Sequence, residues 1–502
     1  SQMSHSDESF LAALSGLSKD QIQQAGQRYT PGMDPQAPNL RIESLFTAIV
    51  NVSCGADALA RFHSILDAFS KAWKGAKNFS QRPSEIQELA DGTQAFLEPM
   101  MERLRARDAE AGTEWSARLT GIESELLADV AHWRAEEAKL QQDAEDSGHS
   151  SAHSTIRHNI NAIGQCLAIV RAEKEYIETP AFKVLFDPQL LVSGEWGTGK
   201  THLLCDFTQH RINRGQATVL VLAKNFQGNV VEEICARIEA GCTAVGVFGR
   251  LEELANKAAE RTVIILDGVN EGRRQEWRKS VSSLQDLVAD RPGIGLIVSC
   301  RTSFEHLAID RKSLENFHTV KHLGFDDQEF DAQAAFFQYY NLPLPEVPLL
   351  DREFSRPLTL KLICKSLQNL SGRKFAKGFA GIASGQKGMT YIFESFINRV
   401  GEPIENEYGL RAKGCWGLLK GSDQIADKRL AGFAPCMAAN LRGYVRRSEA
   451  DRIIAANYPV MSPAKRRQLL DILRTNGLIE EDAVWYSTNN GVKTRVVFRL
   501  PY

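Results

Sequence analysis

The residues with the clearest chemical potential form one short stretch, Gly194 to Thr201. It has glycine, lysine and threonine at every fixed position of the pattern G-x-x-x-x-G-K-[ST], in which backbone N–H groups surround phosphate oxygens. In such a loop Lys200 can reach the β- and γ-phosphates, and the Thr201 hydroxyl can ligate Mg²⁺. A chance glycine-rich turn is the alternative, but we expect a buried strand before the loop and a helix after it. The residues expected to hold phosphates are Gly194, Glu195, Trp196, Gly197, Thr198, Gly199, Lys200, Thr201 and His202.

Two carboxylates follow a second apolar run. Residues 262 to 267 are expected to form a buried strand that ends in Asp267. The carboxyl ends of parallel strands meet at one edge of a sheet, so Asp267 should lie beside the phosphate loop and share Mg²⁺ with Thr201. A turn or helix cap is the other interpretation of Asp267. Glu271 is a candidate for activating the attacking water, with a solvated loop carboxylate as the alternative.

A third apolar run brings a cation to the same edge. Residues 294 to 299 are expected to form a strand, and Arg301 follows it directly. From there its guanidinium can sense a γ-phosphate. An arginine that pairs with a surface carboxylate remains open as the alternative.

The elements that must position these residues alternate between strand and helix. Strands are expected at 190–193, 218–223, 262–267 and 294–299, and helices at 201–211, 229–240 and 248–260. This alternation is typical of a parallel sheet covered by helices on both faces. The pattern therefore predicts a three-layer α/β P-loop NTPase domain at residues 179–324.

The region before this domain is expected to be helical. Residues 1–40 indicate a tail and linker with one short helix near 10–17, and residues 41–178 indicate a helical region. Within it, apolar residues at 115, 119, 122, 126, 130 and 133 form one helical stripe, and those at 156, 160, 163, 167 and 170 form another. Two long helices joined by a polar loop suggest a helical hairpin, whose stripes are more typical of a core than of a partner-binding face.

The region after the P-loop domain also divides in two. Residues 325–386 are expected to be a helical lid, and residues 387–502 to be helices, at 448–457 and 463–475 among others, followed by a hairpin. Asn490-Gly491 between alternating apolar residues favours that hairpin, so the end of the chain is interpreted as a winged helix. Its basic residues could read DNA, although we favour a solvated face; they are Arg446, Arg447, Lys465, Arg466 and Arg467.

Composition narrows the class of protein. The chain has 502 residues, a length that suggests about three or four units. Hydrophobic residues make up 43%, charged residues 24%, and the formal net charge is -2, which excludes a disordered or broadly nucleic-acid-coating chain. No apolar run approaches about 18 residues and no signal segment opens the chain. The nine cysteines are scattered without C-x-x-C pairs, so we expect reduced thiols in a cytoplasmic protein with no membrane contact.

Several motifs together resemble one family. They are GEWGTGKTHLLCD at 194–206, LDGVNE at 266–271, VSCRTSF at 298–304, GFDDQEF at 324–330, NLPLPEVPLL at 341–350, EFSRPLTLKLICKSL at 353–367, GMTYIFESFINRV at 388–400 and VVFRLPY at 496–502. The chain resembles bacterial STAND ATPases, more narrowly the NTPase core of antiviral (Avs-type) defence proteins, which are relatives of NLR immune receptors with NACHT-like cores. The resemblance covers roughly residues 20–502 and is strongest after about residue 180.

The resemblance implies a nucleotide-dependent switch. In that family ATP with Mg²⁺ favours an open, self-assembling form and ADP a closed monomer, hydrolysis is slow, and an effector responds to a phage protein sensed by a C-terminal repeat array. That array is not seen here, so we expect it to be cut off, and no effector is recognised in residues 1–190. The family also places a proline of the lid on the adenine ring, and Pro357 matches that position, although Ser355 replaces the usual glycine. A plain helix start is the alternative for Pro357.

Two other functions stay open at this stage. A DNA-loading ATPase of the initiator type also combines a phosphate loop with a winged helix, and DNA binding that weakens with salt would favour it. A scaffold that holds its nucleotide without hydrolysing it is the second. Unhydrolysed nucleotide retained over many hours would favour that one.

Overall fold

The computed structural model describes residues 5–32, 40–50, 67–68, 70–71, 110–143, 150–226, 229–238, 243–325, 328–344, 352–368, 386–410, 414–488 and 491–500. Its centre is a five-stranded sheet in the order β2-β3-β4-β1-β5, in which every pair is parallel. The strands are β1 Gln189–Gly194, β2 Thr218–Leu222, β3 Thr262–Asp267, β4 Ile294–Arg301 and β5 His318–Lys321. Five parallel strands, with the phosphate loop directly after β1, confirm the predicted α/β P-loop NTPase fold.

The order of the strands fixes where a ligand can bind. From β1 the chain crosses to β2 on one side of the sheet, and after β4 it moves to β5 on the other side of β1. The gap outside the carboxyl ends of strands at such a reversal is the usual ligand site of parallel sheets. The pairing register places Gly194, where the phosphate loop begins, opposite Arg301.

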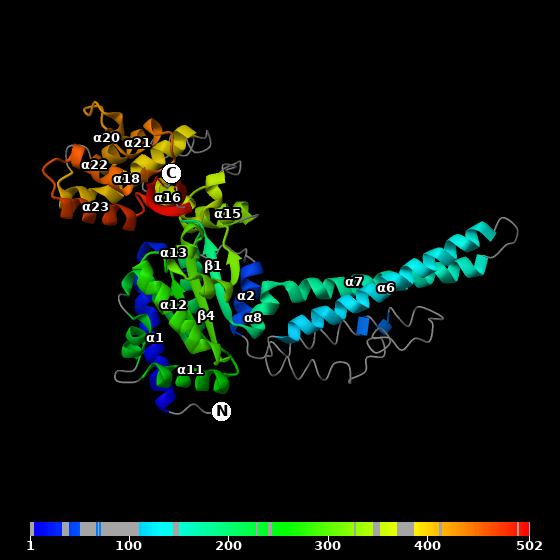
Figure 1. Ribbon diagram of the computed structural model, residues 1–502. Helices are drawn as coiled ribbons and strands as arrows, with labels where there is room; N and C mark the ends of the chain where they lie inside the picture. Colours follow the sequence, from blue (N-terminus) through cyan, green and yellow to red (C-terminus); the bar gives the residue numbers. More distant parts are fainter. Residues whose placement is uncertain are drawn as a thin grey trace.

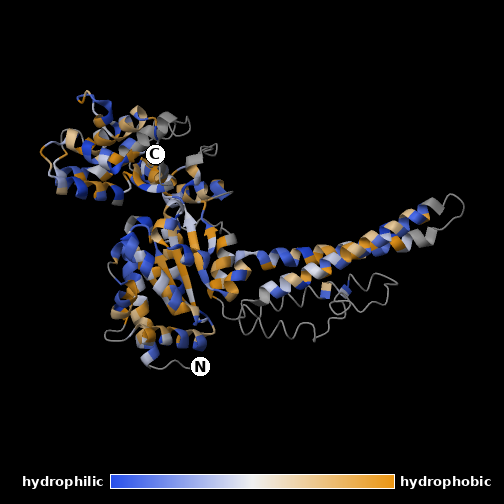
Figure 2. Ribbon diagram, in the orientation of Figure 1, coloured by the Kyte–Doolittle hydropathy of each residue, from blue (hydrophilic) through white to orange (hydrophobic). Residues whose placement is uncertain are grey.

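Helices cover both faces of the sheet, as apolar side chains that alternate along each strand require (Figures 1 and 2). Val219 and Val221 enter one core, while Leu220 and Leu222 enter the other. The helices between strands β1 and β5 are α9 Lys200–Asn213, α10 Val230–Ile238, α11 Ala244–Ala258, α12 Arg274–Ala289, α13 Glu305–Ala308 and α14 Arg311–Glu315. The predicted order of strands and helices in this domain is found with shifts of a few residues at element ends. The cysteines in the described part of the chain are buried, free thiols.

The N-terminal segment differs from the tail and linker expected for residues 1–40. Residues His5–Ala25 form one long helix, α1, which packs along the edge strand β2 (Figure 1). Ser18 Oγ donates to the carbonyl of Thr218 at 2.9 Å and accepts from the N–H of Leu220 at 3.0 Å. Gln21 Oε1 accepts from the N–H of Leu222 at 3.1 Å. Residues 5–25 therefore belong to the P-loop domain, because they satisfy the backbone of its edge strand.

A buried arginine ties the next helices to the same domain. Helices α2 Leu40–Val50 and α8 Pro180–Phe186 pack against each other and against one face of the sheet. Arg261, at the start of β3, donates to the carbonyls of Ala48, Leu185 and Pro292 at distances of 3.2, 2.6 and 2.8 Å. One guanidinium thus satisfies carbonyls of three segments that would otherwise be buried without partners.

The two apolar stripes are the long antiparallel helices α6 Glu110–Asp143 and α7 Ser150–Glu178, which project away from the sheet (Figure 1). Trp115, Leu119, Ile122 and Leu126 of α6 are buried, as are Ile163 and Val170 of α7. Most of the interval from 51 to 109, where further helices were expected, lies outside the described residues. No described helix has the length and apolar character needed to cross a bilayer.

The remaining parts of the chain lie over the carboxyl edge of the sheet (Figure 1). The lid region contains α15 Glu329–Tyr339, the turn η5 Arg352–Ser355 and α16 Pro357–Gln368; most of its proline-rich loop, at 345–350, lies outside the described residues. The C-terminal region contains α18 Gln386–Tyr408, α19 Gly414–Lys420, α20 Lys428–Ala431, α21 Phe433–Ala439, β6 Val445–Arg446, α22 Arg447–Asn457, α23 Pro463–Thr475, β7 Glu480–Thr488 and β8 Gly491–Arg499. Strands β7 and β8 pair as the expected hairpin, and β6 adds a third antiparallel strand. This small sheet, whose hairpin follows α22 and α23, is consistent with a winged helix.

Replacing Ser18 should destabilise the P-loop domain. In Ser18→Ala the Thr218 carbonyl and the Leu220 N–H lose their shared hydroxyl partner, and we expect a loss of roughly 1–3 kcal/mol in the free energy of unfolding. Urea unfolding followed by circular dichroism measures this. Ser15→Ala is the matched control, because Ser15 lies on the same helix and is only partly buried. Equal stability of the two variants would contradict the edge-strand role of Ser18.

Candidate functional site

The phosphate loop joins β1 to α9, and each of its three glycines has a steric reason. Gly197 and Gly199 have φ values of +77° and +103°, which L-residues rarely adopt. A Cβ on Gly194 would lie 2.6 Å from the carbonyl oxygen of His322. The first residues of α9 follow at once, so the free N–H groups of its first turn face the loop. This arrangement can receive an anion of the size of a phosphate.

Lys200 fills the loop with its own ammonium group. Its Nζ donates to the carbonyls of Gly194 at 2.8 Å and Glu195 at 2.7 Å. Burial and the nearby Arg301 guanidinium lower the pKa of Lys200 to about 8. Phosphate oxygens would give the ammonium stronger, charged partners than these two carbonyls.

Thr201 and Asp267 meet at the edge of the sheet as expected. The Thr201 hydroxyl donates to Asp267 Oδ2 at 2.8 Å, and Ser299 donates to Oδ1 at 2.6 Å. Burial, and then the charge of Glu271, raise the pKa of Asp267 above its usual range. A hydroxyl and a carboxylate are the oxygen ligands that suit Mg²⁺, and a cation would relieve the crowding of negative charge. Thr201 and Asp267 therefore fit a magnesium ion.

Glu271 lies on the turn after β3, where Gly268 has a φ of +71° and accepts the Glu271 N–H at 2.8 Å. Its carboxylate pairs with Arg28, whose Nη1 lies 2.6 Å from Oε2. Burial acts to raise the pKa of Glu271, but Arg28 and Arg301 outweigh burial, so the pKa is lowered. Glu271 is thus a partly buried carboxylate, paired with Arg28, that lines the site.

Arg301 lines the same cavity, but its partners come from the winged helix. Its Nη1 donates to the carbonyl of Glu481 at 2.6 Å and lies 3.5 Å from Glu480 Oε1. Its backbone N–H is held by the Asn270 side chain at 3.1 Å. The pairing with a carboxylate that was weighed for Arg301 is therefore present, although the carboxylate belongs to another domain and the arginine is largely buried.

The lid docks directly on the loop. The N–H of Leu358 donates to the carbonyl of Gly197 at 3.2 Å, and Arg356 pairs with Glu195 at 2.8 Å. Pro357 starts α16 and lies over Gly199, with its Cγ 3.4 Å from where a Cβ on that glycine would be. Pro357 is thus both a helix-start residue and part of the cavity wall, and its contact with adenine stays a prediction.

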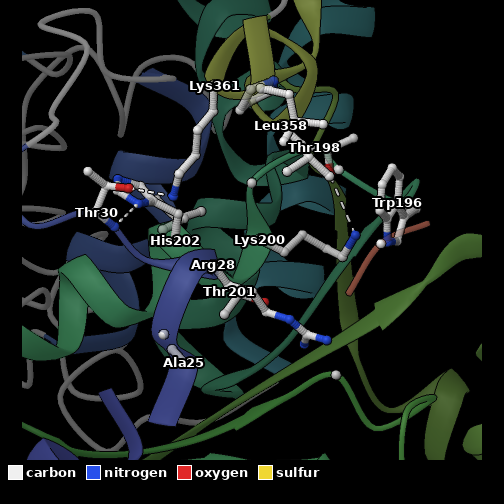
Figure 3. A pocket seen from close by; sticks show the side chains of 18 of the residues that line it. Ala25, Arg28, Thr30, Trp196, Thr198, Lys200, Thr201, His202, Leu358 and Lys361 are labelled. Atoms are coloured by element: carbon white, nitrogen blue, oxygen red, sulfur yellow. Dashed lines mark hydrogen bonds between the residues drawn. The ribbon is translucent and has the colours of Figure 1, made fainter. Parts of the chain in front are cut away.

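The N-terminal segment after α1 closes the side of the cavity next to α9. The Thr30 N–H donates to His202 Nδ1 at 3.3 Å, and Lys361 of the lid donates to the Thr30 hydroxyl at 2.6 Å (Figure 3). Tyr29 packs against the His202 ring, with 5.2 Å between centroids, and its hydroxyl donates to Asp206 at 3.2 Å. His202 therefore links the N-terminal segment to the first turn of α9.

All these parts line one cavity of about 1030 Å³. The winged helix contributes Arg474, Asn476, Gly477 and Glu481, and the Trp196 ring would contact a Cβ on Gly477 at 3.4 Å. The structure brings every predicted site residue to this region. The catalytic, metal-binding and base-contacting roles assigned to them remain predictions.

Sequence reasoning missed residues that reach the cavity from far along the chain. They include Arg28, Thr30, His322, Lys361 and Glu481. His322 follows β5 and is buried, and burial together with Lys200 lowers its pKa to about 4. Only the short apolar pattern near residues 10–17 could have indicated that the N-terminal segment was ordered, and nothing in it indicated which strand it would cover.

Comparisons with known proteins give little more than the fold. No family model matches the chain, and no curated protein matches it. Among solved structures it is similar to Caenorhabditis elegans PCH-2, with 16% identity over 43% of this chain and 62% of that one, and a TM-score of 0.24. It is also similar to Cdc6p of Pyrobaculum aerophilum, with 12% identity over 66% of this chain and 89% of that one, and a TM-score of 0.27. A third similar structure is AMPPCP-bound DnaA of Aquifex aeolicus, with 13% identity over 58% of this chain and 81% of that one, and a TM-score of 0.26. At these scores the fold assignment rests on the strand order and the loop.

Removing the Lys200 ammonium should abolish nucleotide binding without unfolding the protein. Its Nζ donates to two carbonyls and a hydroxyl of its own loop, whereas a bound triphosphate would supply charged partners. For Lys200→Ala we expect at least about a hundredfold weaker ATP binding, equivalent to about 3 kcal/mol of charged hydrogen bonds. Titration calorimetry measures the affinity and thermal unfolding checks the fold. Parental affinity in a folded variant would exclude this loop as the phosphate site.

Proposed function

We propose that this chain is an ATP-controlled signalling switch of the antiviral STAND type. Binding and slow hydrolysis of Mg²⁺–ATP would set whether the lid and the winged helix rest on the P-loop domain, and so control self-assembly and effector activation in defence against phage. One observation carries the proposal: a single cavity is lined by the phosphate loop, the N-terminal segment, the lid and the winged helix. A ligand there touches every part that would have to move.

Phosphate binding would start the change at Lys200. The ammonium group would exchange the carbonyls of Gly194 and Glu195 for phosphate oxygens. Glu195 is also paired with Arg356 of the lid, and Trp196 packs on Gly477 of the winged helix. Rearrangement of two successive loop residues would therefore reach both neighbouring domains.

Arg301 supplies the distinction between ATP and ADP. It starts opposite Gly194 in the sheet and lies in the cavity, yet its guanidinium is held by Glu480 and Glu481 of β7. A γ-phosphate offers a competing anion, whereas ADP does not. The arrangement described here, with Arg301 on β7, would be the closed form.

The contact that must break is electrostatic and therefore reversible. Glu481 lies 3.0 Å from Arg274 of the P-loop domain and 2.8 Å from Arg474 of its own domain. Burial acts to raise the pKa of Glu481, but the two arginines outweigh it and the pKa is lowered. A change from mostly closed to mostly open needs about 5.5 kcal/mol of differential ligand affinity. Phosphate contacts from Lys200 and Arg301 are of that order together.

For hydrolysis, this chain's residues divide the work by position. Thr201 and Asp267 would hold Mg²⁺, which screens phosphate charge, and Lys200 would hold the phosphates. Glu271, ionised inside the site, would accept the proton of the attacking water. A slow reaction suits a machine whose product is a conformation.

A DNA-loading function receives less support from the winged helix. Arg466 pairs with Asp451 at 3.0 Å and also donates to the carbonyl of Met461. Arg474, near the end of the same helix α23, is engaged with Glu481. Part of the basic character of α23 is therefore neutralised within the molecule. Strong DNA binding that falls steeply with salt would reverse this preference.

Substitutions of Glu271 and Asp267 should affect ATP hydrolysis and ATP binding differently. Glu271→Gln removes the base and leaves the phosphate contacts, so we expect normal ATP binding with hydrolysis slower by about a hundredfold or more. Asp267→Asn should lose Mg²⁺-dependent binding as well, because the amide is a poor ligand for a hard cation. Phosphate release and titration with a non-hydrolysable analogue measure the two effects. Parental turnover by Glu271→Gln would move the base elsewhere.

Nucleotide should control the size of the particle. We expect a monomer with ADP and a larger species with a non-hydrolysable ATP analogue, measured by light scattering. Glu481→Gln weakens the pairs with Arg274 and Arg474, so assembly should need less analogue than in the parent.

The matched control is Asp482→Asn on the same strand. Asp482 pairs with Arg499 of the neighbouring strand β8, at 2.8 Å, and so its loss leaves the contact between domains in place. This variant should respond like the parent. Identical masses with ADP and analogue in all three proteins would show that nucleotide does not drive assembly.

A further inference from the structure

The N-terminal segment places the guanidinium of Arg28 in the cavity, where it contacts Glu271. The roles assigned so far do not use this contact. We propose that Arg28 is a positioning residue that holds the Glu271 carboxylate away from the attacking water and so keeps ATP hydrolysis slow. The proposal rests on the proposed function, because it needs Glu271 to act as the base. Its basis is geometric: the guanidinium donates to Glu271 Oε2 at 2.6 Å, and both residues line the cavity.

The position of Arg28 is fixed on both sides. Before it, α1 is hydrogen-bonded to β2 through Ser18 and Gln21, and Gly26, with a φ of +57°, turns the chain into the short helix η1 Gly26–Arg28. After it, Tyr29 is held by His202 and Asp206. Arg28 therefore lies in a segment that is anchored on β2 seven residues earlier, at Gln21, and on α9 one residue later, at Tyr29.

The contact restrains the chemistry in a defined way. In hydrolysis a water oxygen attacks the γ-phosphorus, the bond from that phosphorus to the β–γ bridging oxygen breaks, and its electron pair stays on ADP. The proton lost by the water passes to Glu271 and then to the released phosphate. While Oε2 accepts from Arg28, one of the two carboxylate oxygens is occupied and the charge on the other is partly neutralised. A weaker and misdirected base results.

Among the cations that act on the Glu271 carboxylate, Arg28 is the one in direct contact with it. Arg301 and Lys224 also act on the Glu271 charge, but only Arg28 both attracts it and hydrogen-bonds to it. Arg301 is itself held by β7, and Lys224 donates to the carbonyl of Gln24 at 3.3 Å. Removal of the Arg28 guanidinium should therefore free Glu271 more than any change at these two residues.

The test uses the full chain and measures single-turnover hydrolysis of bound ATP, together with ATP affinity. For Arg28→Gln we expect the chemical step to accelerate by about three- to tenfold, the size of a modest gain in base strength, with ATP affinity unchanged within twofold. Arg28→Lys keeps a positive charge near the carboxylate and should return the rate toward that of the parent. Arg311→Gln is the matched control, because that side chain is 92% exposed on α14 and its ion pair in the described part of the chain is with Glu315, which is itself exposed.

Combining Arg28→Gln with Glu271→Gln shows whether Arg28 acts on the base or only supports the structure. With no carboxylate to release, Arg28→Gln should add nothing to the slow rate of Glu271→Gln. The proposal is overturned if Arg28→Gln slows hydrolysis, leaves its rate unchanged, weakens only ATP binding, or accelerates the reaction equally in both backgrounds. Absence of ATP binding or of turnover in the parent, or parental turnover by Glu271→Gln, would instead overturn the proposed function.

Discussion

The arrangement of this chain depends on one constraint: the charged side chains of the phosphate site must be buried even when no phosphate is bound. A phosphate site must gather cations and carboxylates at one edge of the sheet, and each of them is costly to bury without a partner. Lys200 donates to loop carbonyls, and Arg301 donates to a carbonyl of β7. Glu271 accepts from Arg28, and Asp267 accepts from two hydroxyls. The site is thus satisfied by groups drawn from the N-terminal segment and the winged helix as well as from the sheet.

The protein groups that pair with these charges in place of phosphate explain why separate domains meet at the site. Polar groups at the site join the lid and the winged helix to the P-loop domain: Arg356 with Glu195, Arg301 with Glu480, and Arg274 with Glu481. The pair of Arg356 with Glu195 is exposed, whereas the pairs of Arg301 and Arg274 are mostly buried. Truncating one member of a buried pair is costly because the other is left unpaired, whereas exchanging it for a phosphate oxygen is not. A ligand that brings its own negative charge can therefore release a domain without leaving a buried charge behind. An apolar interface of the same extent would give a nucleotide no such means.

The sequence was informative where function is encoded locally and silent where it depends on tertiary contact. The glycines of the phosphate loop, the strand ending in Asp267 and the hairpin after α23 are set by neighbours in the chain, and each could be predicted. Arg28 is 243 positions from its partner Glu271, and Arg301 meets β7 at a distance of 180 positions. Sequence periodicity gives no sign of contacts between such distant residues. The location of the site could therefore be predicted, but the contacts that Arg28 and Arg301 make there could not.

The N-terminal segment was misread for a related physical reason. Its pattern showed a short apolar helix, yet the residues that decide its role are polar: Ser18 and Gln21 lie three apart on one face of α1, where they match backbone groups of β2. An edge strand with exposed N–H and C=O groups needs such cover, and polar cover looks like solvent exposure in a sequence. Because the same helix leads directly into Arg28, the sheet edge and the active site share one support. Loss of α1 from β2 would leave strand backbone unpaired and would also remove the anchor that directs Arg28 toward Glu271.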